Sequence, residues 1–218
     1  MILRKFLKLM NKMIIIASGP INHLQYFKPL LEGNRVIAVD GGLNHLHKLG
    51  VKPEVLIGDF DSIDTSLLEL YKDIPVYEHP TRKDFTDSEI AIDYVINQSP
   101  DEVILMGVTG HRIDHMITNI HLLKRFVNRG ILAYVLDYHN KVYYCNSDIE
   151  LEGNVGDLLS IVPLTSSVHK IKTYGLEYPL DDETLYFHES RGVSNVFSEP
   201  KVRIETGSGE FLVILSKD

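Results

Sequence analysis

Short, wholly apolar runs separated by longer amphipathic stretches fill the first two thirds of the chain. Each run ends in Gly or Asp and leads into a segment with helical periodicity. Runs that are apolar on both faces and alternate with helices are typical of a parallel sheet covered on both sides. The pattern therefore predicts a three-layer α/β/α domain with a mostly parallel sheet. The runs are residues 14–19, 36–40, 55–59, 103–107 and 132–137.

Signals for helix ends agree with this layout. Thr86 and Glu89 have the spacing of a capping box, in which the threonine caps the helix and the glutamate reaches back to it. Asp114 precedes a second set of apolar residues with helical spacing. Gly50 predicts the end of a helix that begins near Gly41.

The pattern changes after about Tyr144, where short segments alternate between apolar and polar residues and turn residues separate them. This alternating pattern predicts a small antiparallel β domain. We expect an α/β domain over residues 1–144 and a β domain over residues 145–218. The alternating segments are 158–162, 168–173, 185–187, 202–204 and 211–215.

Composition narrows the class of protein. The 218 residues are 44% apolar and 24% charged, which is enough for a folded core, and the net charge of -8 argues against a general binder of nucleic acid. Cys145 is the only cysteine, so one chain can form neither an internal disulfide nor a multi-cysteine zinc site. No run is long enough to span a membrane, and the first one is shorter than a signal peptide requires. We expect a cytoplasmic protein.

Two aspartates follow the third apolar run. If strand geometry continues, Asp59 and Asp61 point the same way while Phe60 turns into the protein. Two carboxylates about 4 Å apart repel by about 4 kcal/mol at an effective dielectric constant near 20, and a bound cation removes that cost. Hard oxygen ligands favour Mg²⁺. The alternative is a turn in which one aspartate caps a helix.

More acids follow other runs. Asp40 closes the second run and precedes Gly41 and Gly42, which allow backbone to approach a ligand at a helix N-terminus. Asp84 and Asp87 flank Thr86 at the start of a helix, where helix capping is a sufficient explanation for each acid alone. Ligands bind beyond the carboxyl ends of the strands in such sheets, so we expect these acids to gather there.

A further cluster follows the run at 103–107. Gly110 gives a loop that phosphates can approach, and Arg112 offers a planar fork to phosphate oxygens. Asp114 and His115 can hold a metal-bound water or transfer a proton. The alternative is an ordinary turn with Asp114 as the helix N-cap. The sequence contains neither a P-loop nor a dinucleotide-binding glycine motif.

Taken in order, these clusters resemble the thiamine pyrophosphokinase family. The resemblance extends over the whole α/β half, and a later segment looks like the family's thiamine-binding part. The matching residues are Asp40–Gly42, Pro53 with Ile57–Ser62, Lys83–Ala91, Gly110–His115 with Asn119, and Gly192–Asn195.

The resemblance implies a six-stranded catalytic domain, a β-sandwich domain and a homodimer with active sites between the subunits. It also implies transfer of the β,γ-pyrophosphate of ATP to the hydroxyl of thiamine, with release of AMP. By motif, Mg²⁺ would be bound by Asp40, Asp59, Asp61 and Asp87. The nucleotide site would include Asp40, Gly41, Gly42, Asp84, Thr86, Gly110, Arg112, Asp114 and His115. Ser194 and Asn195 would face thiamine.

The chain departs from the family pattern at two points. His111 stands where the family often has glycine, which narrows the loop. The chain has no tryptophan, so a ring that stacks on thiamine must come from residues such as Phe197, Tyr186 or Phe187.

The implied reaction is an in-line displacement at phosphorus. Its catalytic residues would be Asp59, Asp61, Asp87, Arg112 and Asp114, with Asp61 or Asp87 orienting the hydroxyl. One alternative is a metal-dependent phosphatase that uses Asp59 as a covalent nucleophile. The other is a nucleotide-binding protein of the same fold without catalytic turnover.

Overall fold

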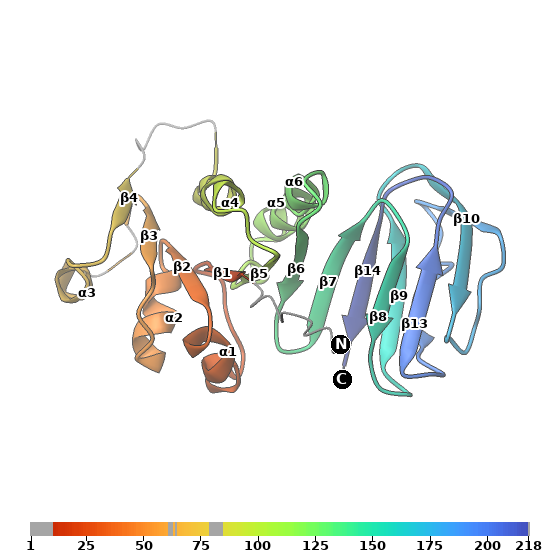
Figure 1. The fold of residues 1–218 in the computed structure, drawn as a ribbon, viewed down its shortest axis with the longest axis horizontal. Helices are drawn as coiled ribbons and strands as arrows, with labels where there is room; N and C mark the ends of the chain where they lie inside the picture. Colours follow the sequence, from red (N-terminus) through yellow and green to blue (C-terminus); the bar gives the residue numbers. More distant parts are fainter. Residues whose placement is uncertain (1–10, 61–62, 64, 79–84, 218) are drawn as a thin grey trace, which may run out of the picture.

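The computed structural model describes residues 11–60, 63, 65–78 and 85–217. Its N-terminal part alternates strands and helices (Figure 1). The elements are β1 (Lys12–Ile16), η1 (Leu24–Phe27), α1 (Lys28–Glu32), β2 (Arg35–Val39), α2 (Gly42–Leu49), β3 (Val55–Gly58), α3 (Thr65–Leu70), β4 (Val76–Glu78), α4 (Asp87–Asn97), β5 (Glu102–Met106), α5 (Ile113–Leu122), α6 (Lys124–Val127) and β6 (Leu132–Leu136).

The elements described from residue 140 to residue 217 are all strands. They are β7 (Asn140–Cys145), β8 (Ile149–Glu152), β9 (Leu158–Pro163), β10 (Ser167–Tyr174), β11 (Glu183–Tyr186), β12 (Asn195–Val196), β13 (Lys201–Glu205) and β14 (Phe211–Ser216).

One long sheet runs through both parts. Its order is β12-β9-β14-β7-β6-β5-β1-β2-β3-β4, and the six strands from β6 to β4 are parallel. The strands from β7 to β12 continue it in antiparallel pairing. In Figure 1, α4, α5 and α6 cover one face of the parallel part, and α1 and α2 cover the other. This confirms the expected α/β architecture and the six parallel strands.

The two-sided apolar runs arise because each central strand feeds two cores. On β1, Ile14 and Ile16 pack in one buried cluster, while Met13 and Ile15 pack in a second cluster on the opposite face. All four side chains are fully buried. Alternate side chains of a strand point to opposite faces, so a strand covered by helices on both sides must be apolar at every position.

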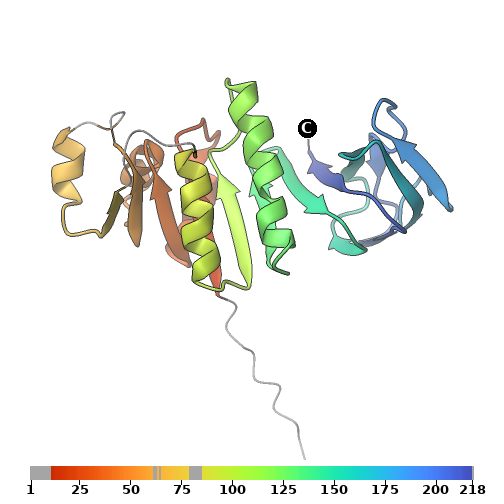
Figure 2. The same cartoon turned by 90° about the horizontal axis from the view of Figure 1, so that it is seen from above.

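The β domain adds a separate four-stranded antiparallel sheet with the order β11-β10-β13-β8. Figure 2 shows it at the opposite end of an elongated molecule from α3 and β4. The expected division between residues 144 and 145 lies within β7, which belongs to the long sheet. None of the described helices is long and apolar enough to cross a membrane.

Four strands were not among the predicted runs, and one of them, β12, has only two residues. The edge strand β4 has only three residues, and its Val76 and Tyr77 are exposed, so it carries no two-sided apolar signal. Strands β7 and β8 lie near Tyr144, where the sequence pattern changes from wholly apolar runs to alternating segments.

Candidate functional site

The loops that follow β1 and β5 interlock at the carboxyl edge of the parallel sheet. The amide of Gly19 donates to the carbonyl of Gly107 at 2.7 Å. A Cβ at Gly19 would lie 2.4 Å from that oxygen, and one at Gly107 would lie 2.3 Å from the carbonyl oxygen of Ala17. His45 of α2 also contacts this corner, with Nε2 2.8 Å from the carbonyl oxygen of Gly19. Only glycine allows the two loops to approach so closely.

Asp40 lies directly over the end of β3. Its amide donates to the carbonyl of Ile57 at 3.0 Å, and its backbone adopts a left-handed conformation with φ 46°. A Cβ built at Gly58 would lie 1.8 Å from Oδ1 of Asp40. The carboxylate therefore occupies the space beside the turn that leads to Asp59, so the structure brings the ends of β2 and β3 together as expected.

The assumption that strand geometry continues through Asp59 and Asp61 was wrong, whereas the convergence of their carboxylates stays a prediction. Strand β3 ends at Gly58, and Phe60 has φ 59°, so the two-residue repeat of a strand does not continue through this segment. Phe60 still packs against the core, as expected. Asp59 is exposed at the carboxyl edge, whereas Asp61 lies outside the described residues.

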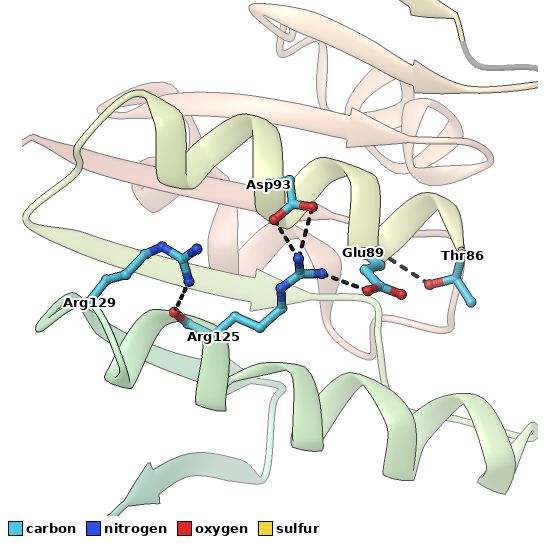
Figure 3. A network of polar contacts seen from close by, with 5 residues as sticks. All are labelled: Thr86, Glu89, Asp93, Arg125 and Arg129. Atoms are coloured by element: carbon cyan, nitrogen blue, oxygen red, sulfur yellow. Dashed lines mark hydrogen bonds and ion pairs between the residues drawn. The ribbon is translucent and has the colours of Figure 1, made fainter. Parts of the chain in front are cut away.

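Helix α4 begins at the same edge with Asp87. Oγ1 of Thr86 accepts a hydrogen bond from the amide of Glu89 at 3.2 Å, which confirms the expected cap. The carboxylate of Glu89 does not complete the expected capping box but binds Arg125 of α6 at 2.7 Å (Figure 3). Asp84 lies outside the described residues.

Arg112 and Asp114 form a two-point ion pair. Nε and Nη2 of Arg112 donate to Oδ1 and Oδ2 of Asp114 at 2.9 and 2.5 Å. Arg112, rather than Asp114, is the N-cap of α5, so the alternative in which Asp114 caps this helix was wrong. The guanidinium lowers the pKa of the Asp114 carboxyl well below its usual range. Both side chains are exposed, at 68% and 62%.

The first turns of α4 and α5 enclose a cavity of about 80 Å³. It is the point where the two helix N-termini meet, and an anion placed there would face both helix dipoles. Thus the structure brings several predicted nucleotide-site residues together. The cavity is lined by Thr86, Ser88, Asp114, His115, Thr118 and Asn119.

The other predicted glycines also lie at this edge. Gly41 is the N-cap of α2, and Gly42 packs on the carbonyl of Ile16. A Cβ at Gly110 would lie 2.5 Å from Cδ of Pro20. The loop from Ser18 to Pro20 therefore forms part of the site, although it was not among the predicted residues. The sequence signal for this loop was Gly19, which ends the first apolar run.

The described acids suit a hard cation that keeps part of its water shell. Among the described ranges, no three His, Cys, Asp or Glu side chains gather closely enough to hold a metal by themselves. Mg²⁺ is usually bound by one or two carboxylates together with waters and substrate phosphates. Asp40 beside the turn to Asp59 fits that requirement.

Ser194 and Asn195 lie in the β domain beside a cavity of about 100 Å³. The buried amide of Asn195 donates to the carbonyl of Tyr178 at 2.6 Å, and its oxygen accepts from the amide of Tyr178 at 3.1 Å. The side chain of Asn195 thus orders the loop that carries Tyr178. Ser194 has φ 58°, and its amide donates to Oγ of Ser160. Tyr178 lines the cavity, with 57% of its surface exposed, and only the tertiary structure identifies it.

Burial decides among the aromatic candidates. Phe197 is 1% exposed in the core, so the expectation that it could stack on thiamine was wrong. Tyr186 and Phe187 are exposed.

The acid-bearing edge and the Ser194 cavity are far apart within one chain. β12, which begins at Asn195, is the first strand of the long sheet, and β2, which precedes Asp40, is the eighth. Neighbouring strands lie about 4.8 Å apart, so the two regions are separated by roughly 30 Å along the sheet. One subunit does not bring them into a single pocket.

A parallel sheet with glycine loops, carboxylates and an arginine at its carboxyl edge, followed by a β domain with its own cavity, has the features of a group-transferring α/β enzyme. Family models identify it further. The model described as "Thiamin pyrophosphokinase, catalytic domain" matches residues 27–135, and "Thiamin pyrophosphokinase, vitamin B1 binding domain" matches residues 146–210. The chain belongs to the thiamine pyrophosphokinase family.

Individual relatives agree with this assignment. The chain is 28% identical to thiamine pyrophosphokinase of Bacillus subtilis over 215 residues, covering 96% of this chain and 100% of that one. The solved structure of the Bacillus subtilis protein has a TM-score of 0.87 and covers 95% of this chain and 99% of that one, at 26% identity. Thiamin pyrophosphokinase from Candida albicans shares the fold, with a TM-score of 0.81 at 14% identity, over 95% of this chain and 90% of that one.

Proposed function

We propose that this chain transfers the β,γ-pyrophosphate of ATP to the hydroxyl of thiamine, giving thiamine diphosphate and AMP. The observation that carries the proposal is that both family models match, each on a part of the chain with its own candidate site. Asp40 and Asp59 stand at one site, and Ser194 stands at the other.

The phosphate site is proposed at the carboxyl edge of the parallel sheet. Asp40, Asp59, Asp61 and Asp87 would hold Mg²⁺, which neutralises charge on the ATP phosphates when bound. Support comes from Asp40, whose carboxylate lies against the turn before Asp59.

Residues of the chain would then orient the reactants. Asp114 holds the guanidinium of Arg112 at two points, so Arg112 is oriented before ATP arrives. Asp61 or Asp87 would orient the thiamine hydroxyl. Thr86, Asp84 and His115 would complete the nucleotide site. The cavity between α4 and α5, which Thr86 and His115 line, supports this proposal.

Thiamine is a cationic aromatic ring, and the exposed face of Tyr178 suits it. Ser194 would contact the ring, and Asn195 would act by positioning the Tyr178 loop. Because the two sites lie roughly 30 Å apart in one chain, we propose a homodimer in which each active site combines both subunits. A cytoplasmic location is consistent with a single cysteine, Cys145, whose burial raises the pKa of its thiol to about 12.

The direct test is to incubate the protein with ATP, Mg²⁺ and thiamine and to quantify AMP and thiamine diphosphate. The two products should appear in equal amounts. Asp59→Asn should lower the rate by at least about 100-fold, as expected when a charge-stabilising group is lost. Asp73→Asn, at an exposed aspartate after α3, is the matched control and should keep the wild-type rate. Free phosphate without AMP would indicate a phosphatase, and ATP binding without turnover would indicate a non-catalytic protein.

A further inference from the structure

A cavity of about 650 Å³ lies between η1, α1 and the turn that joins β6 to β7. The end of β14 and the turn between β8 and β9 complete its walls. None of the predicted catalytic, nucleotide or thiamine residues lines it. Its volume is in the usual range for small-molecule sites. Much of the wall is apolar, with Phe27, Leu30, Leu136 and Leu215 among the lining residues.

Two lysines lie on the same face of this cavity. Lys141 of β7 is directly opposite Leu215 of β14, and the amide of Lys217 continues the pairing by donating to the carbonyl of His139 at 2.9 Å. Directly opposed residues share a face, and so do residues two positions apart in one strand. Lys141 and Lys217 are therefore diagonal neighbours, with Cβ atoms about 7 Å apart.

Aromatic faces hold both ammonium groups. Nζ of Lys217 is 4.8 Å from the ring centroid of Tyr138 and 5.3 Å from that of Tyr26. Nζ of Lys141 is 4.1 Å from the centroid of Tyr134. Tyr138 is itself fixed by His23, whose ring centroid lies 4.0 Å away. Such contacts orient the two cations without neutralising them.

The two carboxylates that line the cavity accept hydrogen bonds from backbone amides of their own turns. Oδ1 of Asp137 accepts from the amides of His139 and Asn140 at 2.8 and 2.7 Å, and Oδ2 of Asp157 accepts from the amide of Asn154 at 2.8 Å. Among the described residues, neither lysine has a carboxylate partner within 4.0 Å. Burial lowers the pKa of Lys141, as expected for a desolvated amine. The cavity thus offers two ammonium groups beside apolar wall, while both of its carboxylates face backbone amides.

We propose that this cavity binds a phosphate monoester with a small apolar body, at a site separate from the proposed catalytic site. The phosphate would accept hydrogen bonds from Lys141 and Lys217, because two neighbouring cations match a dianion. The apolar body would cover the wall formed by Phe27, Leu30 and Leu136.

Phenyl phosphate is a suitable probe, titrated into the ¹⁵N-labelled full chain without ATP or thiamine. We expect saturable shifts of the amide signals of His139, Asn140, Lys141 and Lys217. Lys141→Met and Lys217→Met should each weaken binding by about ten-fold, as the loss of one charge-assisted contact predicts. Lys172→Met is the matched control, because Lys172 lies over Tyr174 but pairs with Asp181 away from the cavity.

Inorganic phosphate and phenol should each bind at least about ten-fold more weakly than phenyl phosphate if both halves of the site contribute. Unchanged affinity in both lysine variants would overturn the proposal. So would shifts confined to Gly107–His115, which would place the probe in the catalytic site, or equal affinity for inorganic phosphate, which would indicate an ion site only. Because the titration contains no substrates, its failure would leave the proposed reaction untouched.

Discussion

At the scale of single residues, the carboxylate of Asp40 lies close against Gly58 in the candidate site. Oδ1 of Asp40 occupies the space where any other residue at position 58 would carry its Cβ, and Gly58 itself has φ 141°. A side chain there would be strained and would displace Asp40. The position of one proposed metal ligand thus depends on the absence of a side chain in the neighbouring strand.

Tyr178 is the residue on which the proposed recognition of thiamine can be tested. Tyr178→Ala should raise KM for thiamine by about ten-fold, since a cation on an aromatic face contributes about 1 to 2 kcal/mol when partly desolvated. Tyr178→Phe should keep most of the affinity because it retains the ring. Initial rates over a range of thiamine concentrations give both values. Tyr174→Ala removes another exposed tyrosine of the β domain and is the control; a larger effect from this variant would contradict the assignment.

At the scale of elements, one arginine joins α4 to α6, the helix that follows α5. Arg125 of α6 donates to Glu89 at 2.7 Å and to Asp93 at 2.9 Å, both on α4 (Figure 3). Helix α6 follows α5 directly, so the contact ties α4 to the α5–α6 pair. Arg125 thereby helps to fix the place of Asp87 relative to Asp114.

Arg125→Gln should raise the Mg²⁺ concentration needed for half-maximal activity several-fold, because α4 would be less firmly held and Asp87 with it. Its effect on stability should be about 1 kcal/mol. Arg35→Gln is the matched control. Arg35, the first residue of β2, forms a comparable ion pair with Glu54 through two hydrogen bonds. Thermal unfolding should report a similar loss for both variants, and only Arg125→Gln should alter the Mg²⁺ dependence. Equal Mg²⁺ curves would show that Arg125 serves stability alone.

A second inter-element contact makes stability depend on pH. Glu210, before β14, accepts from Lys124 of α6 at 2.7 Å and from Tyr144 of β7 at 2.6 Å. The hydrogen bond from Lys124, followed by that from Tyr144, lowers the pKa of Glu210. A carboxyl whose pKa is lower in the folded state stabilises the protein above its unfolded pKa, about 4.3, and loses that effect as the pH falls through the folded value.

Glu210→Gln should therefore lower the free energy of unfolding by about 1 kcal/mol at pH 7. The difference from the wild type should shrink as the pH falls below about 4, where the wild-type carboxyl becomes protonated. Thermal unfolding between pH 7 and pH 3 measures it. Glu177→Gln, at an exposed glutamate, should show no such convergence. A gap that stays constant with pH would count against the electrostatic explanation.

At the scale of the whole molecule, the long sheet separates the two candidate sites. The acids of β2 and β3 and the cavity beside β12 lie toward opposite ends of that sheet. A twofold dimer with the chains antiparallel would bring each acid edge to the partner's thiamine cavity, because a symmetric interface uses the same surfaces twice.

Mixing two defective variants tests this arrangement. When Asp59→Asn and Tyr178→Ala exchange subunits at low thiamine concentration, half of the dimers should be mixed, and each should contain one site with two intact halves. Activity should rise to about a quarter of the wild-type value. Each variant incubated alone is the control. A rate equal to the mean of the two separate rates would indicate that each site belongs to a single chain.

The sequence by itself determined most of the strands, the helix cap at Thr86 and the family. Two-sided apolar runs identify parallel strands because burial on both faces leaves no polar position, and the cap at Thr86 depends only on residues three apart. The acids after the second and third runs were placed at the right edge by connectivity alone, since parallel strands all end at that edge.

Only the tertiary structure decided which side chains meet. The left-handed backbone at Phe60 is a local geometry that the apolar pattern does not encode. The other decisive features are contacts between segments: Asp40 lies against Gly58, Glu89 binds Arg125, and Asn195 binds the backbone of Tyr178. Strand order and register also put Lys141 and Lys217 on one face. Periodicity reports how each segment is buried, whereas the neighbours of a side chain are set by pairings between segments distant in the chain.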